Sequence, residues 1–231
     1  MNQLPLGIGL REGITFDSFH FGNNGEARHT LIHGGQRVIY LWGPPGSGKT
    51  HLLQALGHQA ATRGETSAYL PLADAAEFSP DYLQGLEQLS LVCIDDIDRI
   101  AQQPRWEEAL FHLYNRIRAG DTRLALTAGS SPASLPIALP DLRSRLSWGL
   151  VLRLTLLDDD GKLAVLQQRA RARGMELPTE VGRYLLHRVS RDMTSLSNWL
   201  ERLDERSLAA QRKLTIPFVR ELLLPDEEKP A

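Results

Sequence analysis

The sequence has few of the features that mark secreted or membrane proteins. Its 231 residues include one cysteine, Cys93, so no disulfide forms within the chain, and no apolar run reaches eighteen residues. We also find no charged-then-apolar leader segment. We therefore expect no membrane span and no secretory signal, and a cytoplasmic protein fits these absences. Cys93 lies inside an apolar stretch and is interpreted as a small core residue.

An excess of basic charge is also absent. Lys and Arg number 26 against 28 Asp and Glu, which gives a formal net charge of −2. Domains dedicated to nucleic-acid binding are usually basic, so we expect at most weak direct contact with DNA. The 42% hydrophobic content is ordinary for a globular core. The length suits one compact domain with a smaller second one.

A phosphate-binding loop is the most informative feature of the sequence. Residues 43–50 match G-x-x-x-x-G-K-[ST] and lie between an apolar stretch and a helical pattern. In such loops backbone N–H groups cradle phosphate oxygens, the lysine reaches the β- and γ-phosphates, and the last hydroxyl can bind Mg²⁺. A turn that matches by chance is disfavoured by the strand–loop–helix context. The expected phosphate-binding residues are Gly43, Pro44, Pro45, Gly46, Ser47, Gly48, Lys49 and Thr50.

A second acidic site follows in the segment 91–96, where four apolar residues lead into Asp95 and Asp96. The carboxyl ends of parallel strands meet at the phosphate edge of a sheet. We expect Asp95, with Thr50, to hold Mg²⁺ directly or through water, and Asp96 to act as general base on the attacking water. For Asp96 the alternative of a strand-end residue without fast catalysis stays open.

Alternating patterns predict an α/β base with a parallel sheet, followed by a small all-helical lid. The predicted strands lie near 37–42, 67–71, 90–95, 123–127 and 150–154. The predicted helices lie at about 50–63, 80–87, 105–119, 161–173, 178–190, 194–211 and 215–224. The expected parts are a flexible tail at 1–12, the base at 13–154, the lid at 155–224 and a frayed end at 225–231.

Two arginines, Arg143 and Arg145, follow the fourth predicted strand. They lie too far along the chain to belong to the chain's own phosphate loop. A guanidinium here can instead pair bidentately with a γ-phosphate that another subunit presents. From the pattern alone, a solvated or ion-paired pair of arginines is the competing interpretation.

These motifs together resemble the AAA+ ATPases and, within them, the lineage of the DnaA initiator. The segments that carry the resemblance are TFDSF at 15–19, GKTHLL at 48–53, SRLSWG at 144–149 and LTIPFV at 214–219. The resemblance implies an adenine pocket with Phe16, a nucleotide contact at His51, and an arginine finger, Arg145, that acts in trans. It also implies a polar sensor residue, which Thr127 matches only loosely.

The sequence departs from this lineage in three places. Thr194 occupies the lid position where the family usually has a sensor arginine, which puts γ-phosphate sensing and intrinsic hydrolysis in question. The segment 69–91 is short, and the sequence stops after the lid pattern. We therefore expect neither the DNA-binding helix-turn-helix of the initiators nor their extra helices for single-stranded DNA.

The first residues resemble the peptide Q-L-[SP]-L-x-[LI] with which bacterial proteins bind the β sliding clamp. The matching residues are Gln3, Leu4, Pro5, Leu6 and Ile8. In this recognition mode the glutamine is a polar anchor and the leucines fill an apolar pocket. A leucine-rich tail that packs on its own domain is the alternative. Together with the DnaA-like module, this tail resembles the Hda family, regulators that inactivate DnaA.

The resemblance implies a regulator tethered to the DNA-loaded clamp that promotes hydrolysis of DnaA-bound ATP. It implies adenine nucleotide, ADP or ATP with Mg²⁺, as ligand, with ADP the working form, and a homo-oligomer as a further expectation. Two alternatives remain open. A self-sufficient AAA+ ATPase is favoured by the intact loop with Asp95 and Asp96. An adaptor would recruit DnaA to DNA without acting on hydrolysis.

Replacing both Gln3 and Leu4 by alanine is expected to abolish clamp binding, because it removes the polar anchor and one apolar contact. Folding and nucleotide binding should be unchanged, since the tail precedes every periodic segment. A pull-down with immobilised clamp measures the effect. Clamp binding retained by the double variant would exclude the tail as the tether.

Overall fold

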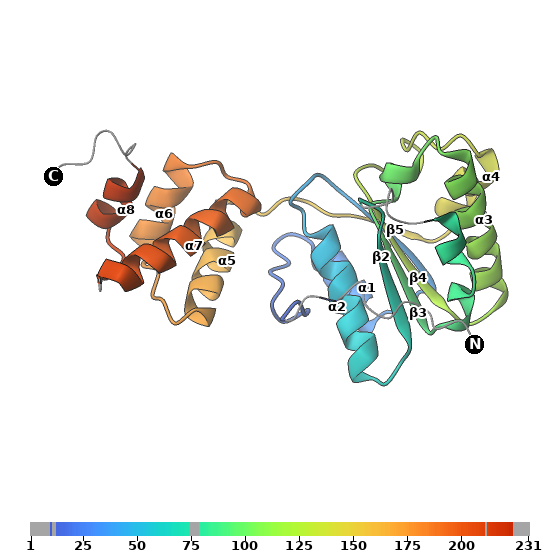
Figure 1. Cartoon of the computed structure of the whole chain (residues 1–231), viewed down its shortest axis with the longest axis horizontal. Coiled ribbons are helices and arrows are strands. Elements are labelled where there is room, and N and C mark those ends of the chain that lie inside the picture. The colour runs from blue at the N-terminus through green and yellow to red at the C-terminus, as the bar shows by residue number, and fades with distance from the viewer. Residues whose placement is uncertain (1–9, 11–12, 74–78, 211, 224–231) are drawn as a thin grey trace. The chain divides into compact units, whose positions relative to one another are not determined.

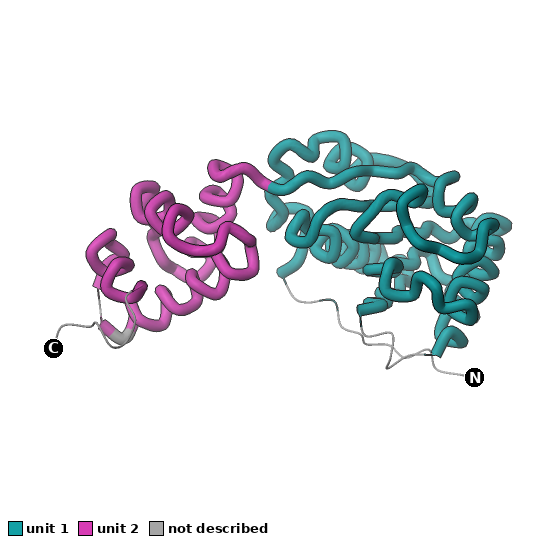
Figure 2. The backbone as a smooth tube through the Cα atoms, turned by 90° about the horizontal axis from the view of Figure 1, so that it is seen from above, with its two compact units in different colours: residues 1–156 teal, residues 157–231 magenta. Residues whose placement is uncertain are grey.

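The computed structural model describes residue 10 and residues 13–73, 79–210 and 212–223. The chain divides into two compact units, residues 1–156 and 157–231 (Figure 2). The first unit contains a parallel sheet between helices, and the described residues of the second form helices and their connections. The predicted α/β base and helical lid are therefore confirmed. The predicted clamp-binding residues and the end at 225–231 lie outside the described residues.

The base is built on a five-stranded parallel sheet with the strand order β2-β3-β4-β1-β5. Its strands are β1 (Val38–Trp42), β2 (Ser67–Pro71), β3 (Leu91–Asp95), β4 (Arg123–Ala128) and β5 (Leu150–Arg153). Each strand matches its predicted range closely. Every residue of β3 is buried, as the near-continuous apolar pattern of a parallel strand covered on both faces requires.

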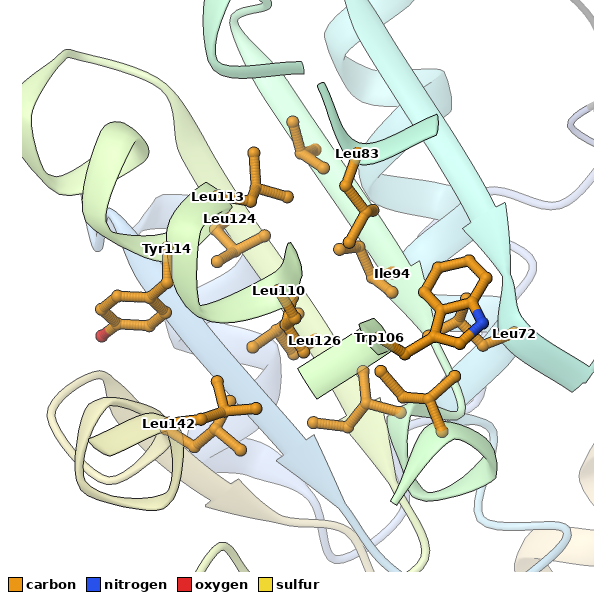
Figure 3. Close-up of a cluster of buried hydrophobic side chains, with 14 of the residues drawn as sticks. Leu72, Leu83, Ile94, Trp106, Leu110, Leu113, Tyr114, Leu124, Leu126 and Leu142 are labelled. Carbon is orange, nitrogen blue, oxygen red and sulfur yellow. The ribbon is translucent and has the colours of Figure 1, made fainter. Parts of the chain in front are cut away.

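Helices cover both faces of the sheet (Figure 1). On one face lie α1 (Gly25–His33) and α2 (Lys49–Thr62), and on the other lie α3 (Pro104–Ala119) and α4 (Pro140–Leu146). Neighbouring strand residues serve opposite faces because side chains alternate along a strand. Ile94 packs in the α3 core, which Figure 3 shows, and Cys93 packs in the α2 core. Burial raises the pKa of the Cys93 thiol to about 12, so the thiol stays protonated.

The prediction of one helix at 80–87 is wrong. The segment forms two 3-10 turns, η2 (Pro80–Leu83) and η3 (Leu86–Gln88). Gly85 separates them with a φ of 82°, a left-handed conformation that a helix cannot continue through. Two short helices, α1 and α4, were not predicted. Few residues of α1 are buried, so apolar periodicity could not reveal it.

The second unit is a bundle of four helices, as predicted. They are α5 (Asp159–Ala172), α6 (Thr179–Arg188), α7 (Met193–Ala210) and α8 (Ile216–Leu223). Leu166, Leu185 and Leu200 are fully buried in their shared core. Asp192 caps α7, because its Oδ1 accepts a hydrogen bond of 2.8 Å from the Ser195 backbone N–H. No described helix of either unit is long and apolar enough to span a bilayer.

A buried carboxylate, Glu107, ties three segments of the base together. The residue is 1% exposed. Its Oε1 accepts hydrogen bonds from the backbone N–H of Gln102 at 2.7 Å and Ala138 at 3.1 Å. Its Oε2 accepts one from Leu139, the N-cap of α4, at 2.7 Å. Since Gln102 follows the turn η4 (Ile97–Ile100), one α3 side chain holds both this turn and the start of α4.

Glu107→Gln is expected to destabilise the base, because an amide nitrogen cannot accept a hydrogen bond from a backbone N–H. The loss should be at least about 1.5–3 kcal/mol in the free energy of unfolding, the usual value of one hydrogen bond to a charged group. Urea unfolding followed by tryptophan fluorescence measures it. Glu108→Gln, at an exposed neighbouring position, is the matched control. Equal urea midpoints for the two variants would contradict the role given to Glu107.

Candidate nucleotide-binding site and arginine finger

The predicted phosphate-binding loop connects β1 to α2. The loop is closed by two backbone hydrogen bonds, from Gly43 N to the Ala128 carbonyl at 3.3 Å and from Ser47 N to the Pro44 carbonyl at 3.2 Å. Gly48 is the N-cap of α2 and has a φ of 90°. The N-terminus of a helix carries unpaired N–H groups and a partial positive charge, which together favour an anion. The loop therefore has the backbone geometry that phosphate oxygens require.

Lys49 is a buried cation without a carboxylate partner among the described residues. It is 8% exposed. Its Nζ donates hydrogen bonds to the carbonyls of Gly43 at 2.9 Å and Pro44 at 3.3 Å. The hydroxyl of Ser47 is also buried and has no hydrogen-bond partner in the described part of the chain. A buried ammonium held only by carbonyls, beside an unsatisfied hydroxyl, fits an anionic ligand whose oxygens complete both sites.

The N-terminal box packs directly against this loop. The Nε2 of His51 lies 2.9 Å from the Thr15 carbonyl oxygen and 3.3 Å from the Ser18 hydroxyl. The Phe19 ring lies 5.0 Å from the His51 ring, centre to centre. A Cβ on Gly48 would come within 2.3 Å of the Phe19 ring. Gly48 is therefore required both for its backbone conformation and for this close packing.

Phe16, predicted in the adenine pocket, is partly buried and packs against the core that covers the α2 face of the sheet. The structure thus places Phe16 and His51 in the same base unit as the loop, with His51 binding the Phe16 segment to α2. Phe19 was not predicted as a site residue. Its position in the same short box was the only signal that could have indicated its contact with the loop.

The hydroxyl of Thr127 joins the carboxyl ends of β3 and β4. It donates a hydrogen bond to Asp95 Oδ1 and accepts one of 2.8 Å from the Asp96 backbone N–H. The Tyr69 hydroxyl donates to the other oxygen, Asp95 Oδ2, at 2.8 Å. Asp95 is 2% exposed, so both of its oxygens are fixed by neighbouring strands. Thr127 was predicted here and Tyr69 was not, because a tyrosine in an apolar strand reads as a core residue.

Asp96 follows β3 in a left-handed conformation, with a φ of 57°. Burial and the negative charges of Asp95 and Asp98 raise the pKa of Asp96, against the opposite effect of Lys49. A carboxylate with a raised pKa is a stronger base than a free aspartate. Asp96 therefore has the electrostatic setting of a general base, and its catalytic use stays a prediction.

The donor set fits a Mg²⁺ ion that arrives with a nucleotide. Thr50 is exposed at the start of α2, and Asp95 and Asp96 end β3. Among the described residues no three His, Cys, Asp or Glu side chains form a cluster that could hold a metal ion. Mg²⁺ in phosphate sites usually has one or two protein ligands and completes its shell with water and phosphate. The roles of Thr50 and Asp95 as metal ligands stay predictions.

The predicted arginine finger lies on the opposite side of the sheet. Arg145 belongs to α4, which packs on the face opposite α2 (Figure 1). Its Nε donates a hydrogen bond to Asn115 Oδ1 on α3 at 3.1 Å. Arg143 differs, because its Nη2 donates to the Ile137 carbonyl at 2.8 Å. Neither arginine forms an ion pair with a described carboxylate.

Thr194 lies in the first turn of α7, two residues after the capping Asp192. Arg191 comes before this cap and pairs with Asp159, its Nη1 lying 3.3 Å from the carboxylate. The helix therefore begins with no arginine in its first turn. The consequence for nucleotide sensing stays a prediction.

Lys49→Ala is expected to weaken ADP binding at least about ten-fold, because it removes a charge-assisted contact worth about 1.5–3 kcal/mol. Isothermal titration calorimetry with ADP and Mg²⁺ measures the affinity. Lys213→Ala, which removes an exposed lysine of the second unit, is the control and should bind as the parent does. If Lys49→Ala bound ADP as tightly as the control, the phosphate site would be wrongly assigned.

Comparisons with known proteins agree with this architecture. The family model of the bacterial DnaA ATPase domain matches residues 10–153, and that of the Hda lid domain matches residues 159–223. Domain III of the Thermotoga maritima replication initiation protein DnaA is similar with a TM-score of 0.78 at 21% identity, over 95% of this chain and 99% of that one. AMPPCP-bound DnaA from Aquifex aeolicus has a TM-score of 0.73 at 23% identity, over 84% and 66% of the two chains. The RuvB Holliday junction branch migration motor of Thermotoga maritima has a TM-score of 0.68 at 17% identity, over 92% and 71%. The chain has the AAA+ fold that these structures share; it belongs to the bacterial DnaA ATPase family, and its second unit is a lid domain of the Hda type.

Proposed function

We propose that this protein binds adenine nucleotide at its phosphate loop and inserts Arg145 into the nucleotide site of a DnaA neighbour. Hydrolysis of the ATP on DnaA then ends its competence for initiation and prevents re-initiation of replication. One observation carries the proposal. Arg145 lies across the sheet from the chain's own α2 and has no carboxylate partner among the described residues.

This geometry supports a partner with the same fold. The phosphate loop and Arg145 serve different faces of one module, so each module offers an arginine to one neighbour and a nucleotide to another. Modules of the same family can repeat this head-to-tail contact, whether in a homo-oligomer or in a mixed assembly. Because the chain has a base of the DnaA type, DnaA is the partner that fits the contact. An arginine supplied in trans stabilises the charge that develops on the transferred phosphoryl group.

The nucleotide of this chain has a structural role in the proposal. Lys49 and the loop would hold its phosphates, Phe16 its adenine, and Thr50 with Asp95 its Mg²⁺. A threonine hydroxyl at position 194 is neutral and too short to replace an arginine contact. Arg191, the nearest alternative, is engaged with Asp159. ADP is therefore the proposed working ligand, with slow turnover by the chain itself.

The proposed site of action is the DNA-loaded sliding clamp in the cytoplasm. The residues that would bind the clamp, from Gln3 to Ile8, precede the described base. A net charge of −2 gives the chain little attraction of its own for DNA. Binding to the clamp would therefore bring the chain to DNA, which its own net charge does not attract.

Arg145→Ala is expected to lower the rate of DnaA–ATP hydrolysis by about 10³- to 10⁵-fold, the contribution of arginine fingers in other systems. ADP affinity should be unchanged, because Arg145 packs on the face of the sheet opposite the phosphate loop's helix α2, and clamp binding should be unchanged, because the proposed tether is the segment 3–8. The assay mixes the protein with DnaA bound to labelled ATP, loaded clamp and DNA, and follows single-turnover hydrolysis. Arg143→Ala, on the same helix, is the matched control and should retain most of the stimulation.

The same assay separates the two alternatives. An adaptor that only recruits DnaA predicts normal stimulation by Arg145→Ala. A self-sufficient ATPase, which the intact loop with Asp95 and Asp96 favours, predicts fast loss of labelled ATP carried by this chain instead of DnaA. Loss of stimulation with Arg143→Ala but not with Arg145→Ala would show that the finger is Arg143 and that its assignment to Arg145 is wrong.

A further inference from the structure

The guanidinium of Arg145 is held by side chains whose roles the proposed function does not explain. Asn115 on α3 accepts its Nε–H at 3.1 Å. The indole of Trp148, two residues after α4, lies under the same guanidinium, with the Arg145 Cζ 4.0 Å from the ring centre. A second guanidinium, that of Arg118 on α3, also lies over this ring at 4.3 Å. The arrangement links the two helices through one aromatic side chain.

The hydrogen bond to Asn115 determines which donors of Arg145 remain for a ligand. A guanidinium has five N–H donors in a fixed planar fork. The Nε–H of Arg145 is bound to Asn115, and the two Nη groups donate no hydrogen bond to another described residue. The four remaining N–H groups all belong to the end of the fork. A phosphate would therefore be met end-on, by Nη1 and Nη2 together.

The ring of Trp148 also restricts the guanidinium, because the group lies over its face. The π face of an indole attracts a cation, and the planar guanidinium can stack on it. Trp148 is 53% exposed, which is unusual for a large aromatic side chain without a structural or binding purpose. A free arginine loses much rotamer entropy when it binds. A finger already held by Asn115 and Trp148 loses less.

Arg118 adds a second positive charge to this surface. None of the ion pairs among the described residues includes Arg118, Arg143 or Arg145. The cations around Trp148 are therefore not neutralised by a neighbouring carboxylate, and the local potential favours an anion. The phosphate groups of a nucleotide on a partner therefore complement the charge of this surface.

We infer that Asn115 and Trp148 are positioning residues that hold the Arg145 guanidinium ready for end-on contact with a partner's phosphate, and Arg118 also lies over the indole. The inference rests on the proposed function for the identity of the partner. The orientation itself belongs to the protein alone and can be measured without DnaA.

The first test therefore uses the isolated full chain with ¹⁵N-labelled arginine. The Nε–H signal of Arg145 is identified by its loss in Arg145→Ala. We expect it to be displaced from the free-arginine position by the indole ring current and slowed in solvent exchange by Asn115. Trp148→Leu should remove the displacement, and Asn115→Leu should remove the slow exchange. A signal at the free-arginine position in the parent chain, or one unchanged in both variants, overturns the inference even if Arg145 proves to be the finger.

The second test measures stimulated DnaA–ATP hydrolysis against protein concentration. Asn115→Leu and Trp148→Leu should lower the maximal rate by ~10- to 100-fold, the effect of a displaced catalytic group, with little change in the half-maximal concentration. Trp148→Phe, which keeps an aromatic face, should recover most of the rate, and His112→Ala, at an exposed site on α3, is the control. A rise in the half-maximal concentration at an unchanged maximal rate would assign these residues to docking and overturn the positioning role. If Arg145→Ala stimulates normally, the proposed function fails, and the NMR result still decides the orientation.

Discussion

The hydroxyl of Thr127 is the contact on which the site depends. It donates to the Asp95 carboxylate and accepts from the Asp96 backbone, so one buried atom joins β4 to both acidic residues at the end of β3. The parallel sheet makes this possible, because its strand order places β4 between β3 and β1. The phosphate loop follows β1 at the same edge. The loop and the acidic residues are therefore brought together by strand order, although they are far apart in the sequence.

The phosphate loop and the strands could be predicted from local sequence. The loop has every residue type that the phosphate-binding pattern requires, and at Gly48 a left-handed φ coincides with close packing against the Phe19 ring. The strands have apolar runs too short for helices and flanked by turn residues. The predicted helix at 80–87 failed at Gly85, where a backbone conformation, not a side-chain pattern, ended the helix. Local periodicity carries information about burial and very little about backbone handedness.

The residues that the sequence did not reveal are those whose roles depend on distant partners. Tyr69 on β2 donates a hydrogen bond to Asp95 on the neighbouring strand β3. Asn115 on α3 accepts a hydrogen bond from Arg145 on α4. Glu107 looks like one charge among several on a polar helix, and only its three backbone donors explain why it is buried. Such residues have no characteristic spacing in the sequence, because their partners are brought near only by strand pairing and by the packing of helices on the sheet.

Glu107 also connects α3 to the helix that carries the predicted arginine finger. Its two oxygens accept hydrogen bonds from the backbone after η4 and from the N-cap of α4, so one side chain holds both segments. Arg145 lies at the other end of that short helix, and Trp148 follows two residues after it. The carboxylate that stabilises the base is thus also bound to the backbone at the start of the helix that carries Arg145.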